Sequence, residues 1–223
     1  MSFNPELITV CTTNMNRNEY LLKALPTWLN RGFKEIIIVD WNSEKAIISD
    51  LKDFKNEHIK VVRVNDQPFF NCTKSRNIAV ECSNTPYIWL IDGDVKMTFK
   101  KLFIDMTPGV FYHGTLFITG APTTGTCLME RKIFDEVNGY SELITTLPGE
   151  DLDLYKRLKK AKYKRKYFPI GSLKHIYHPY SLRTLYRPWF GLNRAAGTRV
   201  AFKQVPWNSD HKQLKIPYEV ITQ

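Results

Sequence analysis

Four short runs of apolar, mostly β-branched residues constrain the fold of this chain most strongly. They cover residues 7–12, 35–40, 59–64 and 87–91. The segments between them have helical spacing, which predicts helices near residues 17–30, 45–54 and 73–82. Continuous β-branched runs separated by helices are typical of parallel strands that are covered on both faces. The pattern therefore predicts an α/β fold built on a doubly wound sheet.

Two local signals refine the first predicted helix. Asn16 or Asn18 is expected to cap its start, because an asparagine side chain can accept a hydrogen bond from the free N–H groups there. Pro26 is expected to kink this helix or to mark its last turn.

The second half of the chain has a more mixed pattern. Residues 110–129 are rich in threonine, glycine and aromatic residues and are expected to form strands and turns. We further predict helices near residues 130–137 and 150–161 and a strand at 166–168. Asn138-Gly139 is a suitable stop for the first of these helices.

Polar or acidic residues follow each of the four apolar runs. They are Thr12-Thr13-Asn14, Asp40-Trp41-Asn42-Ser43, Asn65-Asp66 and Asp92-Gly93-Asp94. Ligands of doubly wound sheets bind beyond the carboxyl ends of the strands. These four loops are therefore where a ligand is expected.

The tripeptide Asp92-Gly93-Asp94 has two interpretations. Two carboxylates one residue apart at a strand end are expected to point the same way, and they suit a divalent cation that bridges diphosphate oxygens. The glycine between them would let a ligand approach the backbone. Asp-Gly-Asp is also a common turn, so this pattern alone leaves both interpretations open.

Two further groups of residues are equally ambiguous by themselves. Glu150 and Asp151 open a predicted helix, where carboxylates are favoured by the helix dipole, and one of them could instead act as a general base. His175 and His178 follow a predicted strand three residues apart. A single histidine there would be structural, whereas two at this spacing together with an Asp-Gly-Asp favour a shared metal site.

Five motifs in order resemble those of GT-A fold glycosyltransferases, of the inverting beta-1,4-galactosyltransferase and chondroitin-synthase type and, more broadly, of family 2. They are Phe70-Asn71-Cys72-Thr73-Lys74-Ser75-Arg76-Asn77; Trp89-Leu90-Ile91-Asp92-Gly93-Asp94; Gly125-Thr126 with Phe134-Asp135-Glu136-Val137-Asn138-Gly139-Tyr140; Gly149-Glu150-Asp151-Leu152-Asp153-Leu154-Tyr155; and Gly171-Ser172-Leu173-Lys174-His175-Ile176-Tyr177-His178. The resemblance implies a Rossmann-like mixed sheet flanked by helices.

The resemblance covers about residues 7–180 and implies a division of the chain. Residues 1–180 would be the GT-A catalytic domain, with a donor nucleotide-binding half at 1–94 and an acceptor and catalytic half at 95–180. Residues 181–223 would form a basic, aromatic extension.

The resemblance also implies a metal site. Asp94, and less directly Asp92, would hold Mn²⁺ against the donor diphosphate, and His178 matches the histidine ligand of the family. His175 stands where the galactosyltransferases have a methionine ligand. Because an imidazole replaces a soft thioether there, the site could also tolerate Mg²⁺.

The remaining roles follow motif by motif. Asp151 matches the catalytic base, and Glu150 precedes it as a second candidate catalytic residue. The residues implied to contact the donor are Thr12 and Asp40 at the nucleoside, Trp41 stacked on the base, and Phe70 and Arg76 at the nucleoside and diphosphate. Two departures bear on specificity. Cys72 replaces an arginine of the family, and the tryptophan-rich segment before the acidic motif is absent, where this chain has residues 145–149.

The implied activity is an inverting, Mn²⁺-dependent transfer of a hexosyl unit. The donor would be a nucleotide-diphosphate sugar, implied to be a UDP-sugar, and the acceptor a hydroxyl of a glycan, a protein or a lipid-linked saccharide. A nucleotidyltransferase would need a glycine-rich loop, and residues 12–18 contain no glycine. A non-catalytic sugar-binding domain would fit part of the pattern, and so would a module that binds nucleic acid or an anionic surface.

The basic residues are unevenly distributed. Residues 156–223 hold 16 of the 32 Lys and Arg but only 2 of the 22 Asp and Glu, and the whole chain carries a net charge of +10. The run at 156–166 is interpreted as a solvated helix face or an anion contact. Basic and aromatic residues alternate over 181–203, which suits an anionic membrane surface, a diphosphate-linked lipid acceptor or closure over the donor. We expect no nucleic acid, because acids at the strand ends would repel phosphate unless a metal intervened.

The sequence also indicates where the protein is located and whether its cysteines are oxidised. The N-terminus is too polar for a signal peptide, and no apolar run is long enough to span a membrane. The four cysteines form no CxxC pair and are expected to be reduced. Together these features predict a cytoplasmic protein, with peripheral membrane contact as an option.

Overall fold

The structure is a computed structural model that describes residues 2–52, 54, 57–102, 104–115, 123–144, 149–179 and 215–222. Its strands are β1 (Ile8–Asn14), β2 (Glu35–Trp41), β3 (Ile59–Val64), β4 (Tyr87–Leu90), β5 (Val95–Met97), β6 (Val110–His113), β7 (Cys127–Glu130), β8 (Lys164–Tyr167), β9 (Leu173–His175) and β10 (Glu219–Thr222). Its helices are α1 (Asn18–Ala24), α2 (Pro26–Leu29), α3 (Cys72–Glu81), α4 (Arg131–Glu136) and α5 (Glu150–Lys160), with short 3₁₀ turns η1 (Pro5–Leu7) and η2 (Ile47–Ser49).

The described strands form one mixed sheet in the order β10-β3-β2-β1-β4-β7-β6-β8, and β5 and β9 form a second, two-stranded sheet. The four strands predicted from the apolar runs lie side by side and parallel, β3 to β2, β2 to β1 and β1 to β4. β7 runs antiparallel to β4 and to β6. The mixed sheet flanked by helices that the family resemblance implies is therefore confirmed.

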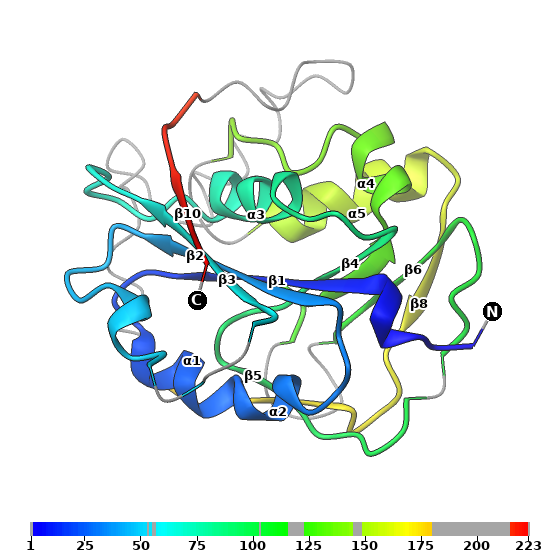
Figure 1. The fold of residues 1–223 in the computed structure, drawn as a ribbon. Helices are drawn as coiled ribbons and strands as arrows, with labels where there is room; N and C mark the ends of the chain where they lie inside the picture. Colours follow the sequence, from blue (N-terminus) through cyan, green and yellow to red (C-terminus); the bar gives the residue numbers. More distant parts are fainter. Residues whose placement is uncertain are drawn as a thin grey trace.

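Helices cover both faces of the large sheet (Figure 1). α1 and α2 lie on one face together with the small sheet, and α3, α4 and α5 lie on the other. Within β2, Ile36 and Ile38 pack into the core on the first face, whereas Ile37 and Val39 pack into the core on the second. Successive side chains of a strand point to opposite faces, so a continuously apolar strand contributes to both cores at once.

The helix predicted near residues 45–54 is not formed in the described part of that range, 45–52 and 54, which holds the 3₁₀ turn η2. Side chains from α1 and β2 make hydrogen bonds with backbone groups of this region. Asn18 donates to the Lys45 carbonyl at 3.0 Å, and Asp40 accepts from the Ile47 N–H at 2.9 Å. One side chain from α1 and one from β2 thus anchor the start of this segment.

The start of the first helix also differs from the prediction. Its N-cap is Arg17, which makes no capping hydrogen bond with its side chain. Asn16 accepts from the Glu44 N–H at 2.7 Å and so is used to hold a neighbouring loop. Pro26 interrupts the helix as expected, since α1 ends at Ala24 and Pro26 begins α2.

The structure also bears on the last predicted strand, the cysteines, a membrane span and the C-terminal extension. The predicted strand at 166–168 is found as β8, which begins two residues earlier. All four cysteines are free thiols. Within the described part of the chain, no helix has the length and apolar character needed to cross a membrane. Residues 180–214, most of the predicted extension, lie outside the described residues, whereas β10 near the end of the chain pairs antiparallel with β3.

Candidate functional site

The candidate site residues gather at one edge of the large sheet. Thr12 lies in β1 and Asp40 in β2, close to the carboxyl ends of both strands, and Asp92 follows β4 at the same edge. Arg76 lies on α3, which covers this sheet. The fold therefore brings together residues that are far apart in the sequence, including Asp151 at the start of α5.

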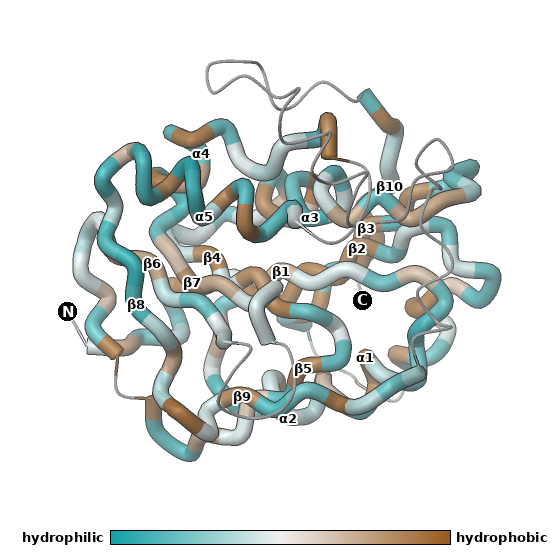
Figure 2. Tube along the Cα trace, turned by 180° about the vertical axis from the view of Figure 1, so that it is seen from behind, coloured by the Kyte–Doolittle hydropathy of each residue, from teal (hydrophilic) through white to brown (hydrophobic). Residues whose placement is uncertain are grey.

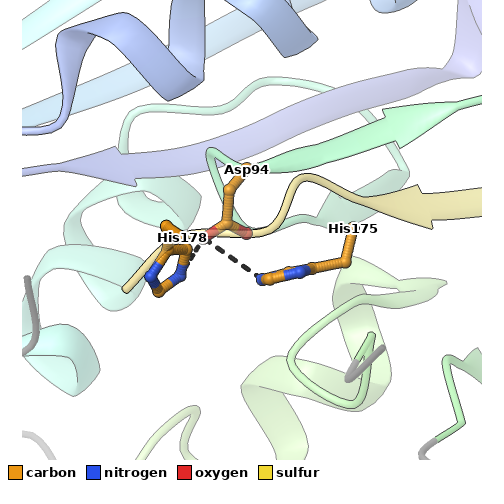
Figure 3. A group of neighbouring side chains, drawn as sticks. All are labelled: Asp94, His175 and His178. Carbon is orange, nitrogen blue, oxygen red and sulfur yellow. Dashed lines mark ion pairs between the residues drawn. The ribbon is translucent and has the colours of Figure 1, made fainter. Parts of the chain in front are cut away.

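Asp94, His175 and His178 form a compact cluster (Figure 3). One ligand atom from each lies within 4.8 Å of the other two. The Oδ2 atom of Asp94 is 3.1 Å from Nε2 of His178 and 3.7 Å from Nε2 of His175. The side chains of Asp94 and His178 are almost fully buried. This is the arrangement that the paired histidines and the acid predict for a metal site.

The small sheet places these three residues together. In the antiparallel pairing of β5 with β9, Val95 lies opposite His175, and the Ile176 N–H donates to the Asp94 carbonyl at 2.7 Å. Nδ1 of His178 lies 3.1 Å from the Pro179 carbonyl. When that nitrogen carries the proton, Nε2 turns its lone pair toward Asp94. A backbone carbonyl behind the ring is a common way to orient a metal-binding histidine.

The donor set fits a divalent cation. Among the described residues, no hydrogen bond reaches the buried Nε2 of His178, although a carboxylate oxygen lies beside it. A buried ring nitrogen without a hydrogen bond is costly unless another partner satisfies it. One carboxylate and two imidazoles offer ligand types that divalent transition metals accept.

Asp94, the one acid of this cluster, has a strongly shifted pKa. Burial by itself would raise its pKa, but the neighbouring His175 and His178 and the Arg17 guanidinium outweigh burial and hold the pKa of Asp94 well below its usual range. Arg17 contacts Oδ2 of Asp94 at 2.6 Å. The carboxylate is therefore ionised, as a metal ligand must be.

A second cluster surrounds the buried guanidinium of Arg76. It is paired with Asp92 through one nitrogen and with Asp151 through the other. The Tyr140 hydroxyl donates to Oδ1 of Asp151 at 3.0 Å and accepts from Arg76 at 3.1 Å. Oε1 of Glu150 is 3.9 Å from the same guanidinium. One cation thus lies against three acidic side chains, two at the start of α5 and one after β4.

Two acids of this second cluster have raised pKa values. Burial, and then the charge of Asp151, raises the pKa of Glu150 to about 8. Burial also raises the pKa of Asp151, against the opposing charge of Arg76. At neutral pH, Glu150 is therefore largely protonated. Perturbed carboxyls of this kind concentrate at functional sites.

The structure gives Asp92 and Asp94 different partners, contrary to the expectation that they point the same way. Asp92 is paired with Arg76, and Asp94 lies with Arg17, His175 and His178. Asp92 is not part of the compact three-residue cluster. Gly93 between them lies against β1, because a Cβ there would come within 3.3 Å of the Thr13 carbonyl oxygen. The tripeptide forms a turn, in which the Val95 N–H donates to the Asp92 carbonyl at 3.0 Å, and of its two acids only Asp94 belongs to the candidate metal cluster.

The residues implied to contact the nucleoside are mostly buried. Asp40 is fully buried, and its Oδ2 atom accepts from Arg63 at 2.8 Å. Trp41 is 0% exposed and donates to the Phe69 carbonyl at 3.0 Å. A stacked base needs an exposed ring face, so the expected stacking on Trp41 has none available. Phe70, which packs edge-on against Trp41, is half-buried instead.

Thr12 lies in the same region. It is 1% exposed, and no hydrogen bond reaches its hydroxyl among the described residues. The Thr12 hydroxyl, near the carboxyl end of β1, is therefore a buried polar group that can still form a hydrogen bond with a ligand.

Three residues at the site were not assigned a role from the sequence. Arg17 had no motif to mark it, because its contact with Asp94 spans 77 positions. Tyr140 belongs to a recognised motif, but only the fold shows its hydroxyl between Arg76 and Asp151. A Cβ on Gly125 would lie 2.4 Å from Oδ2 of Asp92 and 2.8 Å from Arg76, so a larger residue there would displace these paired side chains.

Two family models match successive parts of the chain. Residues 9–103 match the model described as Glycosyl transferase family 2. Residues 116–179 match the model described as N-terminal domain of galactosyltransferase. A search of curated proteins finds no match.

Several solved structures share the fold at low sequence identity. The catalytic domain of Drosophila beta1,4galactosyltransferase 7, in complex with xylobiose, has a TM-score of 0.64 and 17% identity, over 91% of this chain and 83% of that one. The mannosyltransferase PcManGT from Pyrobaculum calidifontis, with GDP-Man and Mn²⁺, has a TM-score of 0.59 and 13% identity, over 74% of this chain and 55% of that one. GalNAc-T7 with UDP, GalNAc and Mn²⁺ has a TM-score of 0.64 and 14% identity, over 78% of this chain and 45% of that one. The chain thus spans about half the length of the last two.

Proposed function

The chain has the GT-A fold and is glycosyltransferase-like, and on this premise we propose that it is an inverting glycosyltransferase. It would move a hexosyl unit from a nucleotide-diphosphate sugar to a hydroxyl of an acceptor. The observation that carries the proposal is the position of the two clusters. The metal-binding set around Asp94 and the acids around Arg76 lie next to each other, joined by the Asp92-Gly93-Asp94 turn.

The proposed metal is Mn²⁺, held by Asp94, His175 and His178, with Asp92 as a less direct contributor. The short distances within the cluster and its ionised carboxylate support this assignment. Two of the structural neighbours are described with Mn²⁺ bound. When bound, the ion supplies positive charge that stabilises the departing nucleotide diphosphate. Mg²⁺ is an alternative to be compared directly.

Asp151 is the proposed general base. The hydrogen bonds that it accepts from Arg76 and Tyr140 both end on Oδ1, so Oδ2 is the oxygen proposed to accept the proton. The acceptor oxygen bonds to the anomeric carbon while the bond from that carbon to the diphosphate oxygen breaks, and Asp151 takes the hydroxyl proton. Glu150, protonated at neutral pH, would keep a second negative charge away from this base.

The proposed donor is a UDP-sugar, and the acceptor is a glycan, a protein or a lipid-linked saccharide. The neighbours are described with UDP and GalNAc, with GDP-Man or with xylobiose, so both uridine and guanosine donors belong in a test. Thr12 and Phe70 remain proposed donor contacts, because one has an unsatisfied hydroxyl and the other a partly exposed ring. The division into donor half, acceptor half and extension is kept as a proposal.

A panel of UDP- and GDP-sugars incubated with the protein and Mn²⁺ tests the proposed function. We expect release of the nucleotide diphosphate from at least one donor and a strong reduction in the Asp151→Asn variant. Asp135→Asn on α4, which removes an exposed carboxylate away from both clusters, is the matched control and should keep the wild-type rate. If no donor is cleaved with Mn²⁺ or Mg²⁺, or if Asp151→Asn cleaves it normally, the proposal is wrong.

A further inference from the structure

A groove of about 880 Å³ lies away from both clusters of the candidate site. Residues that precede β1, follow α2 and follow β5 line it, so it lies toward the end of the large sheet opposite the carboxyl edge. Its lining includes Phe3, Arg31, Phe99, Lys100, Lys101 and Lys166. Neither the metal cluster nor the acids around Arg76 take part in it.

The described lining of this groove is strongly basic. Four of its residues carry positive charge, and Asp105 is the one acid. Lys100 and Lys101 are exposed. Arg31 donates to the Met97 carbonyl at 2.9 Å and lies over the Phe99 ring, with 4.2 Å between guanidinium and ring centre. Arg31 therefore fixes the segment that presents the two lysines.

An apolar turn lies beside these lysines. Ile170 is 74% exposed at the turn between β8 and β9. The turn is tied to the segment of the groove, because the Thr98 N–H donates to the Ser172 carbonyl at 2.9 Å and the Thr98 hydroxyl donates to the Gly171 carbonyl at 2.5 Å. Figure 2 shows the strongly hydrophilic β8 running directly into a hydrophobic stretch before β9. We call Lys100, Lys101, Lys166 and Ile170 the basic patch.

We propose that the basic patch binds the surface of a membrane that contains anionic lipids. Lysines attract anionic headgroups, and an exposed isoleucine gains free energy by entering the boundary between headgroups and acyl chains. Half-buried Phe3 and Phe99 line the same groove as the lysines and give it an aromatic wall. A purely ionic partner such as a nucleic acid would gain nothing from Ile170. This inference does not depend on the proposed transfer reaction.

The small sheet connects the basic patch with the metal cluster. Asp94 and His175 lie at one end of the β5–β9 pair, and Thr98 and Ser172 lie at the other. Four residues of strand span roughly 13 Å. The metal cluster therefore lies one short strand away from the segment that leads into Lys100 and Lys101.

Sedimentation with phosphatidylcholine vesicles, with or without phosphatidylserine, tests the proposal at low salt. We expect the wild type to bind only the vesicles with phosphatidylserine. Replacing two lysines in the double variant Lys100→Gln/Lys101→Gln should weaken that binding about 30-fold, at about 1 kcal/mol per basic residue near an anionic surface. Ile170→Ser should weaken it as well, although it changes no charge.

The matched control is Lys132→Gln with Lys159→Gln, two exposed lysines on α4 and α5, across the large sheet from the small sheet. It removes the same charge and should bind as the wild type does. The proposal is overturned if the wild type does not bind, if the two lysine variants lose binding equally, or if Ile170→Ser binds normally.

Discussion

Arg76 and Asp94 organise the candidate site at the scale of single residues. Arg76 pairs with Asp92 and Asp151, while Asp94 lies beside two histidines and Arg17. The two aspartates of one short turn therefore serve different clusters. In the proposed reaction Asp94 would hold the metal, whereas Asp92 pairs with Arg76, the arginine that also pairs with the proposed base Asp151.

Asp151→Asn should slow sugar transfer by roughly 10²–10⁴-fold, the usual contribution of a positioned general base. The amide can keep the hydrogen bond from Tyr140, but it cannot accept the proton of the acceptor. Nucleotide binding should stay near the wild-type value, because this substitution leaves the metal cluster intact. Steady-state transfer rates and calorimetric binding of the nucleotide measure the two effects separately, and near-normal transfer would rule out this base.

Glu150→Gln should change how stability depends on pH. The pKa of Glu150 is raised by burial to about 8, against an ordinary value of 4.5. Between these values the folded state holds a proton that the unfolded state releases, so the wild type loses stability as pH rises through this window. The variant lacks this loss, and its stability relative to the wild type should increase from about pH 5 to about pH 8.

Urea unfolding of both proteins across that window measures the difference. The exposed Glu81→Gln on α3 is the control for removing a carboxyl without burial, and its offset from the wild type should stay constant. A constant offset for Glu150→Gln as well would show that Glu150 is not protonated in the folded state.

At the scale of elements, α5 carries the proposed base and is held by a buried arginine. Arg157 is 3% exposed and donates to the carbonyls of Val137 and Gly139, each at 2.6 Å. It also pairs with Asp153 one turn earlier at 2.7 Å. These contacts join α5 to the end of α4 and thereby fix the direction from which Asp151 enters the site.

Arg157→Met should lower the free energy of unfolding by about 3 kcal/mol, because it leaves a largely buried carboxylate and two carbonyls without their partner. Lys159→Met, on an exposed position of the same helix, should change it by less than about 0.5 kcal/mol. Chemical unfolding of both variants provides the comparison. Equal effects would mean that Arg157 does not hold α5 in place.

The local pattern predicts some of these elements well and others poorly. The four parallel strands follow from β-branched runs, and α5 follows from its acidic start and helical spacing. The helix predicted near 45–54 is not found among the described residues there, where the side chains of Asn18 and Asp40 instead anchor the backbone of Lys45 and Ile47. Strand β10 has little local signal and depends on pairing with β3, across more than 150 positions.

The candidate site, like the secondary structure, can be predicted from the sequence only in part. Spacing alone suggests that His175 and His178 act together with an Asp-Gly-Asp, and the structure places both beside Asp94. Spacing cannot show that Trp41 is buried or that Arg17 reaches Asp94, because burial and long-range ion pairs are properties of the assembled fold.

At the scale of the whole molecule, opposite charges lie at opposite ends of the large sheet. Acids gather at the carboxyl edge, and the basic patch lies away from it, next to the far end of the small sheet. A nucleotide diphosphate approaching the acidic edge needs a cation to be held there. The arrangement of charges therefore predicts that this molecule binds its nucleotide only together with a metal ion.

Titration calorimetry of UDP against the wild type and the Asp94→Ala variant, each with and without Mn²⁺, tests this claim most directly. We expect tight binding only for the wild type with Mn²⁺, because the variant lacks the carboxylate that His175 and His178 surround. Asp135→Asn should bind as the wild type does. Equal affinity of the wild type and the Asp94→Ala variant under all four conditions would contradict the metal site and, with it, the account of how this chain holds its donor.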